Sequence, residues 1–482
     1  MRLASLVVEG ARLFGDGAVA VTGLTADSRA VRPGFLFAAL QGAKTDGRRF
    51  VGDAVARGAV AVLGDASLEA RALSVPLVVD ADPRRRLARM AAAFYGRQPA
   101  TVVAVTGTNG KTSTVAFLRQ LWAAAGHPAA SLGTLGLEAP GRAPGGSLTT
   151  PDPVALHALL AELAADGIDR LAMEASSHGL DQRRLDGVAL RAAAFLNLTR
   201  DHLDYHGSEA AYRAAKWRLF DALLPPGAAA VLNADMPGVA ELAAAARGRG
   251  LEVVTFGRGA ADLRLAHQVP APNGQALTLA VAGRTVEVRL PIVGVFQAWN
   301  LMAALALGRA TGLDLDAMLA AVPTLAAPRG RMERVGAHPA GAAVFVDYAH
   351  TPDALAVALQ ALRPHCRGCL WVVFGAGGDR DRGKRPEMGA AAAVHADRVI
   401  VTDDNPRSED PAAIRAAIPA ACPGATEIGD RAEAIRTVVR GLGPGDVLLV
   451  AGKGHEPGQI VGDRVLPFDD ATVVRNALGD LG

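Results

Sequence analysis

Short hydrophobic runs that alternate with helical stretches are the feature that most limits how this chain can fold. From about residue 100 onward, strand-like runs such as TVVAV (101–105) and RLAME (170–174) are each followed by a segment of helical character. Parallel strands need a crossover connection between them, and a helix usually supplies it. The alternation therefore predicts parallel sheets covered by helices, which is an α/β fold.

The alternation is interrupted once and then restarts, so we expect more than one sheet. The interruption is the Pro-, Gly- and Arg-rich stretch LAAPRGRMERV (325–335). A chain of 482 residues is too long for one hydrophobic core and suggests about three domains. We expect a small N-terminal α/β domain over residues 1–92, a central parallel-sheet domain over 93–327 and a C-terminal Rossmann-like domain over 328–482.

The charge pattern excludes several classes of partner. The net charge is +2, with basic and acidic residues interspersed, so there is no electrostatic case for binding nucleic acid or an anionic membrane surface. The N-terminus lacks the apolar stretch of a signal peptide. The long uncharged run from Leu290 to Gly308 contains Pro291 and Gly294, which favours a strand end and a buried helix over a membrane span. We expect a cytoplasmic protein.

The segment AVTGTNGKTST (104–114) has the pattern of a phosphate-binding loop. A hydrophobic strand ends here, glycines let the backbone approach a ligand, and Lys111 and Thr112 begin a helix. In such loops backbone N–H groups hold phosphate, the lysine reaches the β- and γ-phosphate oxygens, and the hydroxyl can bind Mg²⁺. Val105 replaces the first glycine of the usual GxxxxGK(S/T) pattern. In its strand–loop–helix context the shortened motif still predicts a nucleotide site rather than a plain turn.

Lys216 is expected to lie in the hydrophobic stripe of its own helix, EAAYRAAKWRLFDALL (209–224). Ser208 is a suitable N-cap, and Tyr212, Leu219 and Phe220 fall on the same face as the lysine. An unpaired buried ammonium group is costly. Either the side chain reaches the edge of the core, or phosphates or metal ions lie beside it; the position alone favours the first alternative.

Glu174 and His202 each follow a predicted strand. The carboxyl ends of parallel strands meet at one edge of a sheet, where ligands of α/β proteins bind. A carboxylate beside the phosphate-binding loop could bind Mg²⁺. Each residue alone is more often an ordinary polar side chain than a ligand, but with the loop at 107–112 they predict one site.

The segment VTDDNPRSED (401–410) places further polar groups after a strand. Pro406 cannot continue the hydrogen bonding of the strand, so the chain turns. The turn leaves Asn405 and Arg407 at the carboxyl end of a predicted buried strand. For an isolated Asn-Pro turn, a polar surface loop is the simpler interpretation.

The order of these segments along the chain resembles that in the Mur ligases, and the resemblance covers nearly the whole sequence. The segments that carry it are DSR (27–29), DGRRF (46–50), TGTNGKTST (106–114), LTTPDP (148–153), MEASSHGLDQRRL (173–185), DHLDYHG (201–207), the Lys216 helix, GRMERV (330–335), DYAHTPDAL (347–355), GGDRDRGKRP (377–386), DNPR (404–407) and AGKGHE (451–456).

The resemblance implies a fold, an activity and a set of substrates. The central domain would be P-loop ATPase-like, between a UDP-binding domain and a Rossmann-like domain. The activity would be an ATP-dependent, ADP-forming addition of meso-2,6-diaminopimelate to the γ-carboxylate of D-glutamate in UDP-N-acetylmuramoyl-L-alanyl-D-glutamate, a step of peptidoglycan precursor synthesis. It would proceed through an acyl phosphate, with ATP as co-substrate and Mg²⁺ as cofactor. We expect the enzyme to be a monomer.

The resemblance also implies binding residues, carried over position by position. For the UDP end they are Ser28, Ala43, Lys44 and Thr45, and for the muramoyl-dipeptide Thr149, Thr150, Ser176, Gln182 and Arg184. For ATP they are Gly107, Thr108, Asn109, Gly110, Lys111, Thr112, Ser113, Asn300 and Arg331. For Mg²⁺ they are Thr112, Glu174, His202 and Lys216, the last as a carbamate. For diaminopimelate they are Arg380, Asp404, Asn405, Pro406, Arg407, Gly452 and Glu456. The catalytic set is Lys111, Lys216, Glu174 and His202.

Two of these assignments have a direct physical reason. A carbamylated Lys216 is an anion, which is favourable beside Mg²⁺ where an ammonium group would be repelled. The Arg407 guanidinium would pair with the carboxylate at the far, D-configured centre of diaminopimelate. The sequence departs from the family at Gln297, where many members have Asn, and we expect an altered hydrogen bond there.

Two alternatives remain open at this point. One is a ligase of the same superfamily that uses L-lysine or another amine acceptor, such as a glutamate chain on folate. The other is a nucleotide-dependent switch or binding protein that performs no ligation. Acceptor-dependent ATP consumption separates the second alternative from both ligases.

Overall fold

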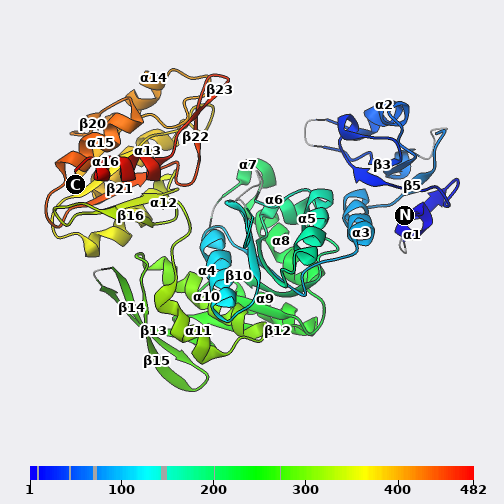
Figure 1. Cartoon of the computed structure of the whole chain (residues 1–482), viewed down its shortest axis with the longest axis horizontal. Helices are drawn as coiled ribbons and strands as arrows, with labels where there is room; N and C mark the ends of the chain where they lie inside the picture. Colours follow the sequence, from blue (N-terminus) through cyan, green and yellow to red (C-terminus); the bar gives the residue numbers. More distant parts are fainter. Residues whose placement is uncertain are drawn as a thin grey trace. The chain divides into compact units, whose positions relative to one another are not determined.

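The computed structural model describes residues 1–7, 10–42, 45–68, 73–142, 149–199, 201–271 and 273–481. The chain divides into two compact units, and Figure 1 labels their helices and strands. The first unit comprises Met1–Ala261 and Ala303–Met318, and the second comprises Asp262–Met302 and Leu319–Gly482. The ranges 1–92, 93–327 and 328–482 stay a prediction.

The first unit begins with a small sheet whose strand order is β1-β5-β4-β3-β2. Its strands are β1 (Arg12–Phe14), β2 (Gly23–Thr25), β3 (Phe35–Ala38), β4 (Ala61–Gly64) and β5 (Leu77–Val79). All neighbours are parallel except β1 and β5. The helices here are α1 (Leu3–Leu6), α2 (Val51–Ala56) and α3 (Pro83–Tyr95). Separate clusters of buried aliphatic side chains cover the two faces of this sheet, as expected for a small α/β domain.

A second sheet of the first unit has the strand order β12-β11-β10-β6-β9-β7-β8. Its strands are β6 (Thr101–Thr106), β7 (Ala129–Gly133), β8 (Gly136–Glu138), β9 (Arg170–Glu174), β10 (Leu190–Phe195), β11 (Ala229–Asn233) and β12 (Glu252–Gly257). These strands pair in parallel, apart from β7 with β8. Because β9, β6 and β10 are neighbours, the segments that follow them lie together at one edge of the sheet.

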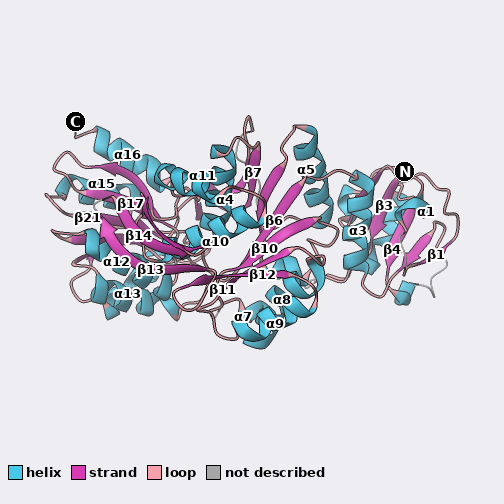
Figure 2. Ribbon diagram, turned by 90° about the horizontal axis from the view of Figure 1, so that it is seen from below, coloured by secondary structure: helices cyan, strands magenta, loops and turns pink. Residues whose placement is uncertain are grey.

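Helices connect these strands and cover the sheet (Figure 2). They are α4 (Lys111–Ala124), α5 (Pro153–Ala165), α6 (Ser177–Asp181), α7 (Leu203–His206), α8 (Glu209–Arg218) and α9 (Val239–Gly248). The residues of α10 (Phe296–Ala310) and α11 (Leu315–Ala321) are divided between the two units. β15 ends at Leu290 before α10 begins, which confirms the expected strand end and helix in the uncharged run. Across the residues that the structure describes, no helix is both long and apolar enough to cross a membrane.

The second unit contains an antiparallel meander and a doubly wound sheet. The meander consists of β13 (Leu263–Ala271), β14 (Gly274–Val281) and β15 (Arg284–Leu290). The sheet has the order β16-β17-β21-β18-β19-β20. Its strands are β16 (Glu333–Ala337), β17 (Ala343–Asp347), β18 (Leu370–Phe374), β19 (Arg398–Val401), β20 (Thr426–Glu427) and β21 (Val447–Ala451). Only β16 runs antiparallel to its neighbour in this sheet.

Helices cover both faces of this sheet, which is the Rossmann-like arrangement expected. The helices are α12 (Pro352–Leu362), α13 (Lys384–His395), α14 (Pro411–Ala416), α15 (Arg431–Gly441) and α16 (Asp470–Gly479). Side chains of α12, α13 and α14 belong to one core cluster, and those of α15 and α16 belong to the cluster on the other face. A separate hairpin is formed by β22 (Gly458–Val461) and β23 (Arg464–Pro467).

A fully buried ion pair joins the two helices on the second face. Arg431 on α15 donates two hydrogen bonds of 2.7 and 2.8 Å to Asp470 on α16, and both side chains are 0% exposed. Asp470→Asn leaves the guanidinium without its counter-charge, so we expect the free energy of unfolding to fall by about 3–5 kcal/mol. Urea unfolding followed by circular dichroism measures the change. Glu433→Gln on α15 is the control, because its pair with Arg436 is exposed and should contribute no more than ~1 kcal/mol.

Candidate active site

The phosphate-binding loop connects β6 to α4, as the sequence predicts. Gly110 directly precedes the helix with φ of 88°, a conformation that favours glycine. The loop is fixed from the strand beside it: the Asn109 N–H donates to Asn197 Oδ1 at 2.9 Å, and Asn197 Nδ2 donates to the Asn109 carbonyl at 2.9 Å. Lys111 Nζ donates to the carbonyls of Gly107 and Thr108, each at 2.9 Å. The loop N–H groups and the lysine thus lie at the N-terminus of one helix, a favourable place for phosphate.

Lys216 is buried against the same loop. Its side chain is 1% exposed, and Nζ donates to the Gly107 carbonyl at 2.8 Å. Nζ also lies 4.5 Å from the centre of the Tyr212 ring. Tyr212, Leu219 and Phe220 are buried beside it, which confirms the predicted apolar stripe. The interpretation in which Lys216 reaches solvent was wrong, because the helix lies too deep in the unit.

Two lysine nitrogens therefore share the Gly107 carbonyl, Lys111 at 2.9 Å and Lys216 at 2.8 Å. Burial lowers the pKa of Lys216 well below its ordinary value, and the positive charge of Lys111 lowers it further. A neutral amine at this position is nucleophilic at neutral pH, whereas an ammonium group is not. The buried environment therefore favours the neutral form of Lys216 more than solvent would.

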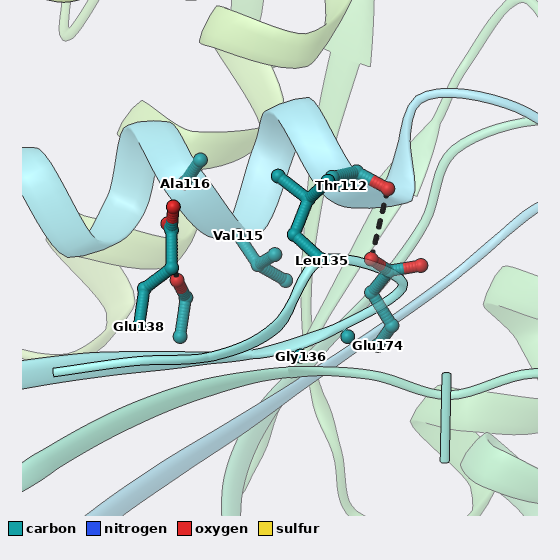
Figure 3. A pocket seen from close by; sticks show the side chains of 9 residues that line it. Thr112, Val115, Ala116, Leu135, Gly136, Glu138 and Glu174 are labelled. Atoms are coloured by element: carbon teal, nitrogen blue, oxygen red, sulfur yellow. Dashed lines mark hydrogen bonds between the residues drawn. The ribbon is translucent and has the colours of Figure 1, made fainter. Parts of the chain in front are cut away.

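Glu174 ends β9 and is held by hydroxyl and amide donors, of which Figure 3 shows the Thr112 hydroxyl. Thr112 Oγ1 donates to Glu174 Oε1 at 2.8 Å, and the Thr134 N–H donates to the same oxygen at 2.8 Å. Thr134 Oγ1 donates to the other oxygen at 3.1 Å. Glu174 is 1% exposed. A cavity of about 10 Å³, roughly one water molecule, lies beside Thr112 and Glu174 and extends toward Glu138.

Hydroxyl groups continue this network toward the residues expected to hold the dipeptide. Thr134 Oγ1 lies 3.1 Å from Thr149 Oγ1, and Thr150 Oγ1 lies 3.1 Å from Ser176 Oγ. Arg184 Nη1 donates to the Thr150 carbonyl at 2.6 Å. The same arginine donates through Nη2 to Gln182 Oε1, and Gln182 Nε2 donates to the Tyr205 hydroxyl. The structure brings all five expected dipeptide residues into one connected set.

His202 lies in an aromatic cluster on the loop before α7. Its φ is 51°, an unusual backbone conformation for a residue with a side chain, and its side chain is 47% exposed. The imidazole is 3.5 Å from Asp201 and contacts the His178 ring edge to face, with 5.0 Å between ring centres. No group of three or more His, Cys, Asp or Glu side chains able to hold a metal ion occurs within the described ranges. Any Mg²⁺ site here would also need hydroxyl, water or phosphate oxygens.

The residues expected at the UDP end lie in the N-terminal part of the first unit. Ser28 is half-buried and begins a short helical turn after Asp27, whose carboxylate accepts the Arg29 N–H at 2.9 Å. Thr45 is exposed. Ala43 and Lys44 lie outside the described residues.

Asn300 and Arg331 belong to the second unit. Asn300 Nδ2 donates to Gln297 Oε1 at 2.9 Å; the altered hydrogen bond expected at Gln297 stays a prediction. Both side chains are buried. The Arg331 guanidinium lies over the Tyr348 ring at 4.6 Å from its centre.

The DNPR turn follows β19 in the second unit, and strand β22 fixes it. Arg407 has φ of 53°; its N–H donates to the Ile460 carbonyl at 3.0 Å, and its carbonyl accepts the Gly462 N–H at 2.7 Å. Arg407 Nη1 donates to the Gly378 carbonyl at 2.8 Å. Within the described part of the chain, its Nε and Nη2 have no hydrogen-bond partner. Part of the guanidinium therefore remains available for a ligand.

Acidic groups lie close to this turn. Asp404 is buried. Gly452 has a φ of 114°, which favours glycine, and a Cβ added there would lie 2.7 Å from Asp404 Oδ2. Glu456 Oε2 accepts a hydrogen bond from Asn405 Nδ2 at 2.9 Å. Arg380 is exposed, and its Nη1 donates to the carbonyl of Asp379 at 3.2 Å.

Sequence reasoning missed two contributors, Thr134 and Lys453. Thr134 follows a strand and binds both oxygens of Glu174, but nothing in its own segment indicates that role. Lys453 donates to Glu456 Oε2 at 3.1 Å. Lys453 lies three residues before Glu456 in the AGKGHE segment, and this spacing could have indicated its role.

Comparisons with protein families find matches along most of the chain. Residues 20–95 match the Mur ligase family catalytic domain, residues 105–308 match the Mur ligase middle domain, and residues 330–454 match the Mur ligase glutamate ligase domain.

Comparisons with individual proteins agree with these matches. A protein of Bradyrhizobium diazoefficiens named UDP-N-acetylmuramoyl-L-alanyl-D-glutamate–2,6-diaminopimelate ligase is 56% identical over 465 residues, covering 96% of this chain and 95% of that protein. A ligase of the same name from Caulobacter vibrioides is 55% identical and covers 95% of each chain. A solved structure with that name aligns with a TM-score of 0.75 at 34% identity, covering 100% of this chain and 99% of the other. The ADP complex of MurF ligase from Thermotoga maritima, 19% identical with a TM-score of 0.64 and covering 95% and 97%, has the same fold.

Proposed function

This chain belongs to the Mur ligase family, and from that membership we propose that it joins meso-2,6-diaminopimelate to the γ-carboxylate of the D-glutamyl residue of UDP-N-acetylmuramoyl-L-alanyl-D-glutamate. ATP is consumed and ADP and phosphate are released. The observation that carries the proposal is the identity above 50% with ligases of this name over 95% of the chain or more. The product is a precursor of peptidoglycan.

Joining a carboxylate to an amine in water requires activation of the carboxylate. The γ-carboxylate attacks the γ-phosphorus of ATP, ADP leaves, and an acyl phosphate forms. An amine of diaminopimelate then attacks the acyl carbon, phosphate leaves with the bonding electrons, and the nitrogen loses a proton. Lys111 and the N–H groups of its loop stabilise the negative charge on the transferred phosphoryl group. The enzyme contributes mainly by positioning the substrates and neutralising charge.

Mg²⁺ fits the donors at the edge of the central sheet. Thr112 Oγ1 and the Glu174 carboxylate are buried 2.8 Å apart beside the phosphate-binding loop, and hydroxyl and carboxylate oxygens are the ligands that Mg²⁺ prefers. These two groups would hold the ion together with His202 and the Lys216 carbamate. The ion would supply charge neutralisation for the phosphate oxygens. The carbamate forms when the neutral Lys216 amine attacks CO₂, making an N–C bond and releasing one proton.

The remaining substrate contacts follow the same proposal. Ser28, Ala43, Lys44 and Thr45 bind the uridine nucleotide, and the hydroxyl network of Thr149, Thr150 and Ser176, with Gln182 and Arg184, binds the dipeptide. The glycines, Thr108, Asn109 and Ser113 of the loop bind ATP. Asn300 and Arg331 are also proposed as ATP-binding residues. Residues 1–92, 93–327 and 328–482 form the three domains that carry these sites. The enzyme acts as a monomer in the cytoplasm, where ATP and UDP-linked sugars are made.

The amine acceptor binds at the DNPR turn. The free edge of the Arg407 guanidinium binds the carboxylate at the far centre of diaminopimelate, since a guanidinium and a carboxylate match in two parallel hydrogen bonds. Asp404 and Glu456 bind the ammonium group of that centre. Asn405, Pro406, Arg380 and Gly452 complete the pocket.

Purified protein with ATP, Mg²⁺ and the UDP-muramoyl-dipeptide is expected to release phosphate only when diaminopimelate is added. The product should be heavier than the dipeptide substrate by diaminopimelate minus water in a mass spectrum. L-Lysine at the same concentration is the matched acceptor, and no amine is the blank. Equal or faster turnover with lysine would assign the chain to the lysine-adding alternative, and acceptor-independent ATP hydrolysis would contradict ligation.

A further inference from the structure

A buried lysine lies behind the acceptor pocket. Lys453 follows β21 and is 0% exposed. Its Nζ donates to Asn405 Oδ1 at 3.0 Å and to Glu456 Oε2 at 3.1 Å. A buried ammonium group is costly unless it is paired and hydrogen-bonded. Lys453 meets this requirement by donating to Asn405 and Glu456, two residues of the proposed acceptor pocket. Its hydrogen bonds therefore fix that pocket.

These contacts fix the orientation of the Asn405 amide. Asn405 Oδ1 accepts hydrogen bonds from Lys453 Nζ and from the Ile460 N–H, the latter at 2.9 Å. A lysine ammonium and a backbone N–H can only donate, so the amide oxygen must face them. Nδ2 is thereby directed at Glu456 Oε2, which it reaches at 2.9 Å. Asn405 is 4% exposed, so its amide atoms form hydrogen bonds with the protein rather than with solvent.

The orientation of Glu456 follows from the same contacts. Oε2 accepts from both Asn405 Nδ2 and Lys453 Nζ. For Oε1, no hydrogen-bond donor is found in the part of the chain that the structure describes, and the side chain is 33% exposed. Without Lys453, Asn405 Oδ1 keeps only the Ile460 N–H as a donor and Glu456 Oε2 keeps only Asn405 Nδ2, among the described residues, so both side chains would be held less firmly.

We propose that Lys453 is a positioning residue for the acceptor: it fixes Asn405 and Glu456 so that one carboxylate oxygen faces the ammonium group of the incoming diamine. Asn405 then acts by holding Glu456 in place. The proposal rests on the diaminopimelate ligase activity proposed above. Recognition of the ammonium end by Glu456 and Lys453 is distinct from recognition of the carboxylate by Arg407.

Lys453→Met removes the ammonium group and keeps most of the side-chain volume. We expect the KM for diaminopimelate to rise roughly 10- to 100-fold, the effect of losing hydrogen bonds to a charged group. The KM for ATP and kcat should change by less than about threefold, because the variant removes binding that is equal in ground and transition states. Where lysine turnover is measurable, its KM should rise by the same factor, because both diamines carry the ammonium group. Initial-rate kinetics with each substrate varied in turn measures these values.

A double-mutant cycle separates positioning from a general structural role. In a Glu456→Gln background the carboxylate is gone, so adding Lys453→Met should change the KM for diaminopimelate by less than about threefold. Lys453 is only structural if the KM for diaminopimelate in the double variant rises by the product of the two single effects. The same conclusion follows if the KM for ATP rises as much as the KM for diaminopimelate. If Lys453→Met does not fold, Lys453→Gln, which keeps a hydrogen-bond donor, takes its place in the double-mutant cycle. Wild-type enzyme without diaminopimelate-dependent ADP release would contradict the proposed function; an active wild type with an unchanged KM in the variants would contradict this inference alone.

Discussion

Arg407→Ala is expected to remove most of the preference for diaminopimelate over lysine. In the structure Arg407 Nη1 is held by the Gly378 carbonyl, and the backbone of the residue is fixed by Ile460 and Gly462. The guanidinium therefore cannot turn away from a lysine, which lacks the distal carboxylate and would leave this charge unpaired. Sites built to hydrogen-bond a group reject the analogue that lacks it by about 10⁴-fold. We expect the ratio of kcat/KM for diaminopimelate to that for lysine to fall by about 10³-fold or more.

The comparison needs a variant that removes an arginine nearby without touching the pocket. Arg382 is 74% exposed and pairs with Glu409 at 3.1 Å, so Arg382→Ala should leave the ratio within about twofold of the wild type. Phosphate release with each diamine over a range of concentrations gives both ratios. An Arg407→Ala enzyme that keeps the wild-type ratio would show that another group reads the distal carboxylate.

Replacing Lys216 is expected to reduce turnover by about 10²- to 10³-fold, the usual effect of removing one group that stabilises transition-state charge. The Lys216 amine is buried beside Lys111, which lowers its pKa well below the ordinary value, and a neutral amine can form a carbamate with CO₂. Lys216→Met removes the carbamate. Its thermal unfolding midpoint should stay the same or rise, because a buried amine is replaced by an apolar group. Turnover and unfolding are measured on the same preparations.

Lys216→Arg distinguishes a carbamate from a positive charge. Arginine supplies a positive charge and does not form the carbamate, so its turnover should be as low as that of the Met variant. Wild-type protein in ¹³C-labelled bicarbonate should give a carbamate carbon signal that both variants lack. Wild-type activity in Lys216→Arg, or the absence of the signal in active enzyme, would contradict the carbamate.

Local features of the fold were predictable because they depend on a few neighbouring residues. The strand, glycine bend and helix around Lys111 follow from hydrophobic runs and turn residues within one short segment, and the structure confirms them. Predicted ends were less accurate. The hydrophobic run LRAAAFLNL (190–198) has the pattern of one strand, but β10 ends at Phe195. Beyond that end, the Asn197 carbonyl accepts the Thr108 N–H of the phosphate-binding loop at 3.1 Å.

The predicted end of the helix that carries Lys216 was also inaccurate. The sequence predicts one helix over 209–224, but α8 ends at Arg218 and a wider π-helical turn runs from Leu219 to Leu223. The Leu224 N–H donates to the Leu219 carbonyl at 3.1 Å, five residues back. Residue propensities do not distinguish these two hydrogen-bond patterns, because both keep the same face buried.

The sequence by itself determined the α/β class, the phosphate-binding loop, the turn with Arg407 and the family, since each depends on local spacing or on the order of short segments. Only the tertiary structure showed that Lys216 shares the Gly107 carbonyl with Lys111, although Lys216 and Gly107 are 109 residues apart. It also decided that Lys453 and Ile460 orient the Asn405 amide from 48 and 55 positions away. Hydrogen bonds between distant segments depend on how the strands are ordered in the sheet, and no single stretch of sequence contains that order.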